Sequence, residues 1–161
     1  MACGLAGWVA GCATDGGGLS RVTSGGPSQP VEQLHLLLTS MAVDVDGRPG
    51  PDGFGVRLYA SHRRAKEATP IESGTLELMM FDGRLAGGEL EAATPLKTWR
   101  FAAQELKARA QKTEIGTSYR FILSWGAQRP TKGTITIVAR YEPLRGRPVR
   151  SGPGTIPMSV P

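Results

Sequence analysis

The stretch Tyr119-Arg120-Phe121-Ile122-Leu123-Ser124-Trp125 places a large aromatic or apolar side chain at every second position. The same period of two returns in Thr134-Ile135-Thr136-Ile137 and continues to Tyr141. Successive side chains of a β-strand point to opposite faces of the sheet, so this pattern predicts two strands that each bury one face.

Working outward from these two strands, the same period recurs upstream in three further segments. They are centred on Leu34, Leu36 and Leu38; on Phe54, Val56, Leu58 and Ala60; and on Leu76, Leu78 and Met80. After Leu38 the apolar positions change parity at Thr39-Ser40, which predicts a β-bulge in one long strand or a bend between two strands. Trp99 and Phe101 indicate a short strand, and residues 148–158 an edge strand broken by two prolines.

One segment, residues 102–112, has helical spacing instead. Ala103, Leu106 and Ala110 share one face, while Lys107, Arg109 and Lys112 are expected on the outer face. Short strands with a single inserted helix favour a mainly β fold, an antiparallel β-sandwich of immunoglobulin-like or transthyretin-like type. A parallel α/β sheet would need a helix after most strands, and those helices are missing from the pattern.

The composition fits one soluble domain that spans residues 31–161. Of the 161 residues, 40% are hydrophobic and 20% charged, and no apolar run approaches the ~20 residues of a membrane-spanning helix. The charge is unevenly distributed: residues 31–96 carry six Lys/Arg against ten Asp/Glu, whereas residues 97–161 carry twelve against three. The basic half is either an ordinary solvated surface or a site for polyanions and anionic headgroups.

Both cysteines, Cys3 and Cys12, precede the expected domain, which excludes a disulfide framework and a zinc site built on cysteines. The stretch Val9-Ala10-Gly11-Cys12 resembles the lipobox of bacterial lipoproteins, in which the cysteine receives a diacylglycerol. Residues 1–11 would then be a truncated signal segment, and residues 12–30, rich in Gly, Ser, Thr and Pro, a flexible tether.

Residues 1–11 contain neither Lys nor Arg, and their apolar run is short. A secretory signal needs a basic n-region and a longer apolar core, so this interpretation places the true start upstream of Met1. The expected address is the bacterial cell envelope, on the periplasmic face of a membrane. The alternative is a cytoplasmic protein with a Gly-rich leader.

Three segments of the expected domain resemble a group of uncharacterised bacterial envelope lipoproteins. They are residues 44–53, with Asp-x-Asp-Gly-x-x-Gly-x-Asp-Gly; Trp99 to Leu106; and Tyr119 to Trp125. The resemblance spans most of residues 31–158. It implies a β-sandwich and an envelope address, and it implies no activity.

The loop from Asp44 to Gly53 holds three carboxylates, those of Asp44, Asp46 and Asp52, within nine residues. Carboxylate oxygens are ligands that Ca²⁺ prefers. The EF-hand pattern fails here because Arg48 and Pro49 occupy its fifth and sixth positions. The two remaining interpretations are a different calcium site and a plain Asp/Gly/Pro turn whose carboxylates bond local amides.

Two basic groups are candidate anion-binding sites for an acidic protein, a glycan or a lipid headgroup. The first comprises Lys107, Arg109 and Lys112, and the second Arg145, Arg147 and Arg150. Nucleic acid is not expected as a partner, since no recognition helix or aromatic-interleaved binding motif occurs. The large aromatics Trp99, Tyr119, Phe121 and Trp125 fit the core by strand parity, with a sugar-stacking platform as the alternative.

No catalytic constellation emerges from the sequence. His35 and His62 lack a nucleophile motif, and Glu77, Glu105 and Glu114 are scattered rather than paired. We therefore expect a non-enzymatic, membrane-anchored envelope lipoprotein whose sandwich domain binds or scaffolds a partner, without a required cofactor. The alternative is a soluble domain that recognises an acidic glycan, an anionic headgroup or a metal ion.

Overall fold

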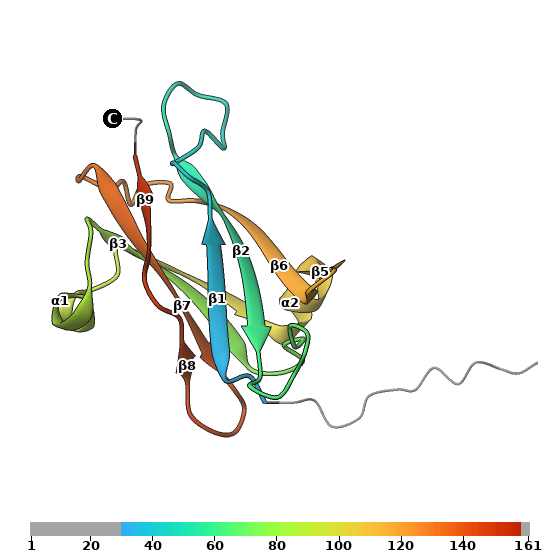
Figure 1. The fold of residues 1–161 in the computed structure, drawn as a ribbon. Helices are drawn as coiled ribbons and strands as arrows, with labels where there is room; N and C mark the ends of the chain where they lie inside the picture. The colour runs from blue at the N-terminus through green and yellow to red at the C-terminus, as the bar shows by residue number, and fades with distance from the viewer. Residues whose placement is uncertain (1–29, 159–161) are drawn as a thin grey trace, which may run out of the picture.

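The computed structural model describes residues 30–158, which form two antiparallel sheets packed face to face (Figure 1). The first sheet has the order β1-β2-β6-β5; in the second, β4, β3 and β7 are neighbours, and β8 and β9 both pair with the far side of β7. The strands are β1 (Gln33–Leu38), β2 (Gly53–Ser61), β3 (Thr75–Asp82), β4 (Lys97–Ala102), β5 (Ala110–Thr113), β6 (Gly116–Ser124), β7 (Thr134–Glu142), β8 (Val149–Arg150) and β9 (Gly154–Pro157).

This strand order decides between the two predicted sandwich types. Immunoglobulin domains place strands A, B, E and D in one sheet and C, F and G in the other. With β1 as A, the described strands reproduce that order, and β4 adds a strand beside β3. The predicted antiparallel β-sandwich is therefore confirmed, with the connectivity of the immunoglobulin type.

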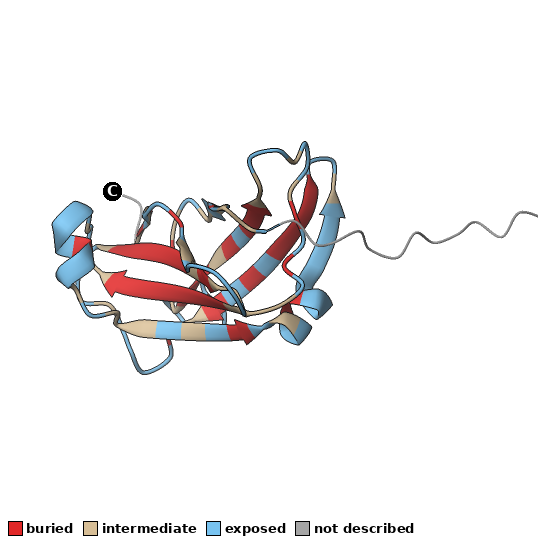
Figure 2. Cartoon of the chain, turned by 90° about the horizontal axis from the view of Figure 1, so that it is seen from below, coloured by how far each residue is buried: buried red, intermediate tan, exposed pale blue. Residues whose placement is uncertain are grey.

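The core lies between the sheets, where inward side chains of both meet. Figure 2 marks the buried residues of the strands in red. Phe101 of β4 packs on Phe121 of β6 with ring centroids 4.6 Å apart, and Phe54 meets Trp99 edge to face at 5.6 Å. Both aromatic pairs join one sheet to the other. These contacts follow from the period of two in each strand, which turns every second side chain toward the opposite sheet.

The chain bulges after β1, as predicted, but the buried face keeps its parity: Ala42 is buried like Leu34, and Val45 is exposed. Leu38 lies opposite Val56, and Val43 lies opposite Gly53, so the four residues 39–42 on one side face the two residues 54 and 55 on the other. The displaced segment reaches the second sheet, because the Ala42 amide donates to the Pro157 carbonyl at 3.0 Å. The predicted bulge thus joins the edges of the two sheets. Residues 148–158 form the predicted edge, which is divided into β8 and β9.

The helix predicted over residues 102–112 is shorter than expected. Helix α2 spans Ala103–Arg109, and the Glu105 carboxylate accepts the Ala102 amide at its start. Residues 110–113 instead form β5, which pairs with the beginning of β6 through a tight turn before Gly116. The prediction that Lys112 lies on the outer face of the helix is therefore wrong. Pairing with the edge of β6 outweighs the weak helical preference of this short segment.

A second helix, α1 (Gly87–Ala92), was not predicted. It covers part of the outer face of the second sheet, where Leu90 packs against Met79, Phe81 and Val138. These outward positions are buried for that reason, although strand alternation alone would leave them in water. No helix within residues 30–158 is long and apolar enough to cross a membrane.

The connection from β2 to β3 is held by two tyrosines as it passes from one sheet to the other. The Ile71 amide donates to the Tyr119 hydroxyl at 2.6 Å, and the Tyr141 hydroxyl donates to the Ser73 carbonyl at 2.9 Å. Burial raises the pKa of Tyr119, which outweighs the opposing effect of the bond from Ile71. The tyrosines therefore serve as structural anchors of this crossover.

Candidate functional site

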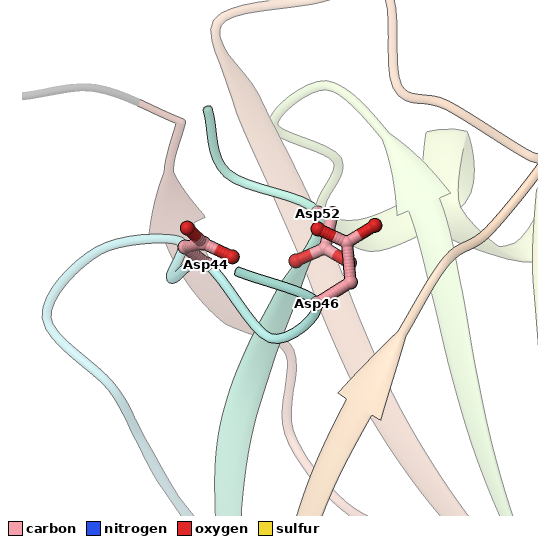
Figure 3. Close-up of side chains that lie close together, drawn as sticks. All are labelled: Asp44, Asp46 and Asp52. Atoms are coloured by element: carbon pink, nitrogen blue, oxygen red, sulfur yellow. The ribbon is translucent and has the colours of Figure 1, made fainter. Parts of the chain in front are cut away.

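The loop between β1 and β2 brings Asp44, Asp46 and Asp52 together (Figure 3). One carboxylate oxygen of each lies within 4.8 Å of the others, and two of the three residues are exposed. Asp44 follows the residue that bridges to Gly53, and Asp52 directly precedes β2, so the bridge closes the loop and gathers the acids.

Each carboxylate already accepts hydrogen bonds from its surroundings. Asp44 accepts the Gly47 amide at 2.7 Å, Asp46 the Arg48 amide at 2.9 Å, and Asp52 the Val45 amide at 2.6 Å. The second oxygen of Asp52 accepts the Ser124 hydroxyl at 3.2 Å. These bonds are the turn chemistry expected of Asp in a Gly/Pro-rich loop.

The same geometry fits a calcium ion. Two ligands of one ion, each about 2.4 Å from it, can lie at most about 4.8 Å apart, and the three oxygens meet this limit. A carboxylate oxygen that accepts one amide keeps a further lone pair for a cation. Asp44, Asp46 and Asp52 are the residues that would hold the ion, and backbone carbonyls or water would have to complete its six to eight ligands.

The structure separates the two predicted basic groups. Lys107 lines a hollow with Ile71 and Glu72, while Arg145 and Arg147, in the loop between β7 and β8, line another that also includes Glu72. The crossover segment, which carries an acidic side chain, therefore borders both hollows.

Two members of these groups have contacts of their own. The Arg109 guanidinium lies 5.4 Å from the ring centre of Phe101 and 5.7 Å from that of Phe121, a cation–π arrangement at the open side of the sandwich. Arg150 lies opposite Arg140 in the second sheet. These placements leave Lys107, Arg145 and Arg147 as the predicted anion ligands that border hollows.

A row of charges crosses the outer face of the second sheet. Glu77 of β3 lies opposite Arg100 on one side and Arg140 on the other, and it is buried. Arg100 donates to the Glu77 carboxylate at 2.7 Å, which raises the pKa of that arginine. Because both neighbours compensate the Glu77 charge, its role is structural.

The other acids and histidines singled out in the sequence also have structural partners or stand alone. His35 contacts the Ser61 hydroxyl at 3.0 Å, and His62 lies 3.7 Å from Glu32. The backbone amide of Arg63 donates a hydrogen bond to the Glu32 carboxylate, and this bond is the main cause of the lowered pKa of Glu32. Glu105 caps α2. Within the described residues His35 is thus the histidine that contacts a hydroxyl, and its ring forms no bond to a carboxylate that would orient it.

Asp82, at the end of β3, organises the turn before β7. Burial opposes its ionisation, but hydrogen bonds from the Thr131 hydroxyl and from the amides of Lys132 and Thr131 outweigh burial and lower the pKa of Asp82. The carboxylate thus holds two backbone amides of the turn, and its role is structural as well.

Three of the four large aromatics lie in the core, as predicted, which removes most of the alternative, a sugar-stacking platform. Tyr119, Phe121 and Trp125 are buried, and only Trp99 is partly exposed, with the Lys97 ammonium 5.2 Å from its ring centre. Three of the four rings therefore cannot stack on a sugar at the surface.

The sequence analysis missed a groove on the outer face of the first sheet. Arg57 and Arg120 lie opposite each other there, beside the exposed side chains of Leu37 and Ile122. The available signal was that each arginine stands at a polar position in a strand of alternating polar and apolar residues. Which strands are neighbours, and in which register, could not be read from those positions.

Three predictions concern the amino-terminal region: the signal segment 1–11, the tether from residue 12 and lipidation of Cys12. They fall on residues 1–29, outside the described part of the chain. Comparison with known proteins adds no assignment to the described domain. No protein-family model matches the chain, and no curated protein or solved structure is significantly similar to it.

Proposed function

We propose that this protein is a non-enzymatic envelope lipoprotein, anchored in a membrane through Cys12, whose immunoglobulin-type sandwich binds or scaffolds a partner. The observation that carries the proposal is the stretch Val9-Ala10-Gly11-Cys12 and its position ahead of the domain. Two acyl chains at such a cysteine give stable anchoring, where one alone is marginal.

The arrangement around Cys12 supports this proposal. A Gly/Ser/Pro-rich segment follows the cysteine and ends where the folded domain begins, with β1 starting at Gln33. Such a composition gives a flexible linker that can hold a domain away from a surface. The resemblance to envelope lipoproteins points to the same address and remains a prediction.

Metabolic labelling of the full chain in its native host with an alkyne-bearing fatty acid tests the anchor. We expect incorporation that Cys12→Ser abolishes, and globomycin should block cleavage and leave a labelled, uncleaved precursor. Cys3→Ser is the matched control, because it removes the other thiol and should keep the label. Equal labelling of both variants, or no label on the unmodified chain, contradicts the proposal.

The carboxylate cluster favours a second candidate, a soluble domain that recognises a metal ion, an acidic glycan or an anionic headgroup. The three carboxylate oxygens that lie within 4.8 Å of one another support recognition of a metal ion. Calcium that binds only the folded state raises stability by about 2.7 kcal/mol at a hundredfold excess over its dissociation constant.

Thermal melting with added CaCl₂ tests this candidate. The melting temperature should rise with calcium and lose that dependence in Asp44→Asn/Asp46→Asn. The control variant is Glu89→Gln/Glu91→Gln, which removes two acids from α1 and should keep the calcium response. A melting temperature that stays constant up to millimolar calcium would contradict the metal site.

A further inference from the structure

The outer face of the first sheet holds a groove of about 640 Å³. Leu37 of β1, Arg57 of β2 and Arg120 of β6 form one row across three strands, and the next row places Gly55 opposite Ile122. Gly55 has no side chain of its own, and the Thr39 side chain lies over it, with its methyl 2.8 Å from where a Cβ would stand. Both residues line the groove beside the two arginines. This volume lies in the range of sites that bind small ligands or a few peptide side chains.

The two arginines are an electrostatic anomaly of the groove. Like charges directly opposite each other on neighbouring strands destabilise a sheet. Within residues 30–158 neither guanidinium forms an ion pair or a hydrogen bond, whereas Arg100 and Arg140 of the other sheet both pair with Glu77. A carboxylate that bridged both arginines would relieve the repulsion and could accept bidentate bonds.

The walls of the groove are apolar. Leu37, Val45 and Ile122 line it with 57%, 40% and 59% of their surfaces exposed. They are three of the five large hydrophobic side chains that are exposed in the described part of the chain. An exposed apolar cluster of this kind marks an interaction site.

The far end of the groove has the opposite charge. Asp44, which lines it, follows the residue that bridges to Gly53, and Gly53 lies four residues along β2 from Arg57. At ~3.3 Å per residue the arginines and this end are about 13 Å apart. Asp46 and Asp52 add further negative charge beside Asp44. An anionic membrane surface would meet repulsion at this end.

We propose that the groove binds an extended segment of a partner protein, in which an acidic side chain meets Arg57 and Arg120 and apolar residues follow. A basic side chain about four positions from the acidic one would reach Asp44. This inference rests on the proposed role of the sandwich as a binding domain. It is independent of lipidation. Peptide binding without a lipid label would overturn only the proposed anchor, and a lipid label without peptide binding would overturn only the proposed groove.

Selection of a phage-displayed random 12-mer library on the purified chain tests the proposal. Enriched peptides should carry Asp or Glu next to apolar residues, with Lys or Arg about four positions away. A synthetic peptide of the enriched sequence should bind Arg57→Gln/Arg120→Gln about tenfold more weakly. The charge-matched control Arg64→Gln/Arg84→Gln, which changes two exposed arginines outside the groove, should bind like the unmodified chain.

Two further measurements keep the test independent of folding. The melting temperature of Arg57→Gln/Arg120→Gln should equal or exceed that of the unmodified chain, because the like charges are removed. Amide chemical shifts of the unmodified chain should move on peptide addition around Leu37, Gly55 and Ile122. Enrichment without acidic residues, no enrichment, shifts confined to other surfaces, or arginine-dependent binding to vesicles of anionic lipid instead of peptides would overturn the proposal.

Discussion

Replacing Tyr119 by Phe removes one oxygen from the crossover between the sheets and leaves the aromatic ring in place. The lost hydroxyl is the acceptor of the Ile71 amide at 2.6 Å, and both residues are buried, at 1% and 4% exposure. The amide would then be buried without a partner, which costs about 1–3 kcal/mol. We expect the free energy of unfolding of Tyr119→Phe to fall by that amount.

Urea unfolding followed by tryptophan fluorescence measures this change, and Tyr141→Phe is the matched control. The Tyr141 hydroxyl donates to the carbonyl of Ser73, a partly exposed residue whose oxygen can accept water instead. Its loss should cost only about 0.5–1.5 kcal/mol. If Tyr119→Phe costs no more than Tyr141→Phe, the assignment of Ile71 as a buried, singly satisfied donor is refuted.

Alkaline pH gives a second readout of the same contact. Burial raises the pKa of Tyr119 above its unfolded value of 10.0, so the neutral hydroxyl is favoured in the folded state. Its contribution to stability is complete below pH 10 and is lost as the pH rises from there toward the folded pKa. Between these limits the stability of Tyr119→Phe should fall less steeply than that of the unmodified chain. Parallel curves would contradict this reasoning.

Three further predictions concern stability. Asp82→Asn should weaken the acid dependence of stability. Because the pKa of Asp82 is lowered, its contribution to stability is present above pH 3.8 and is lost as the pH falls toward the folded pKa. A pH series of urea melts measures this change. Leu90→Ala should cost about 2–3 kcal/mol in the same melts by emptying the pocket under α1, and a cost under about 0.5 kcal/mol would show that the helix is not packed there. Gly74→Ala should destabilise the fold by more than about 1 kcal/mol, because φ is +78° and an added Cβ would meet the Glu142 carbonyl. Gly88→Ala, with open space around it, should be neutral or stabilise by about 0.4–1 kcal/mol. Equal melting temperatures of the two variants would contradict both assignments.

The strands were predictable because their signal is local. In β6, Tyr119, Phe121, Leu123 and Trp125 stand two apart, so one face of the strand had to be apolar wherever it was placed. The bulge after Leu38 was predictable for the same reason, since the break in the alternation at Thr39-Ser40 is visible within a few residues. The acidic loop was recognisable as well, because its three carboxylates lie close along the chain.

The errors arose where a distant part of the chain overrides the local pattern. Residues 110–113 continue a helical spacing, yet they pair with the start of β6. Met79 and Phe81 occupy outward positions of β3, yet α1 covers them. In each case a tertiary contact contributes more free energy than the local preference.

The sequence by itself determined that the chain forms an antiparallel sandwich with a Gly/Pro-rich acidic loop, and that both cysteines stand ahead of it. Alternation of side chains is a property of each strand alone, so it can be read without knowing the neighbours. Only the tertiary structure decided that Arg57 faces Arg120 while Glu77 lies between two arginines. Strand register depends on pairings between residues far apart in the chain, and a shift of one residue would exchange every such neighbour.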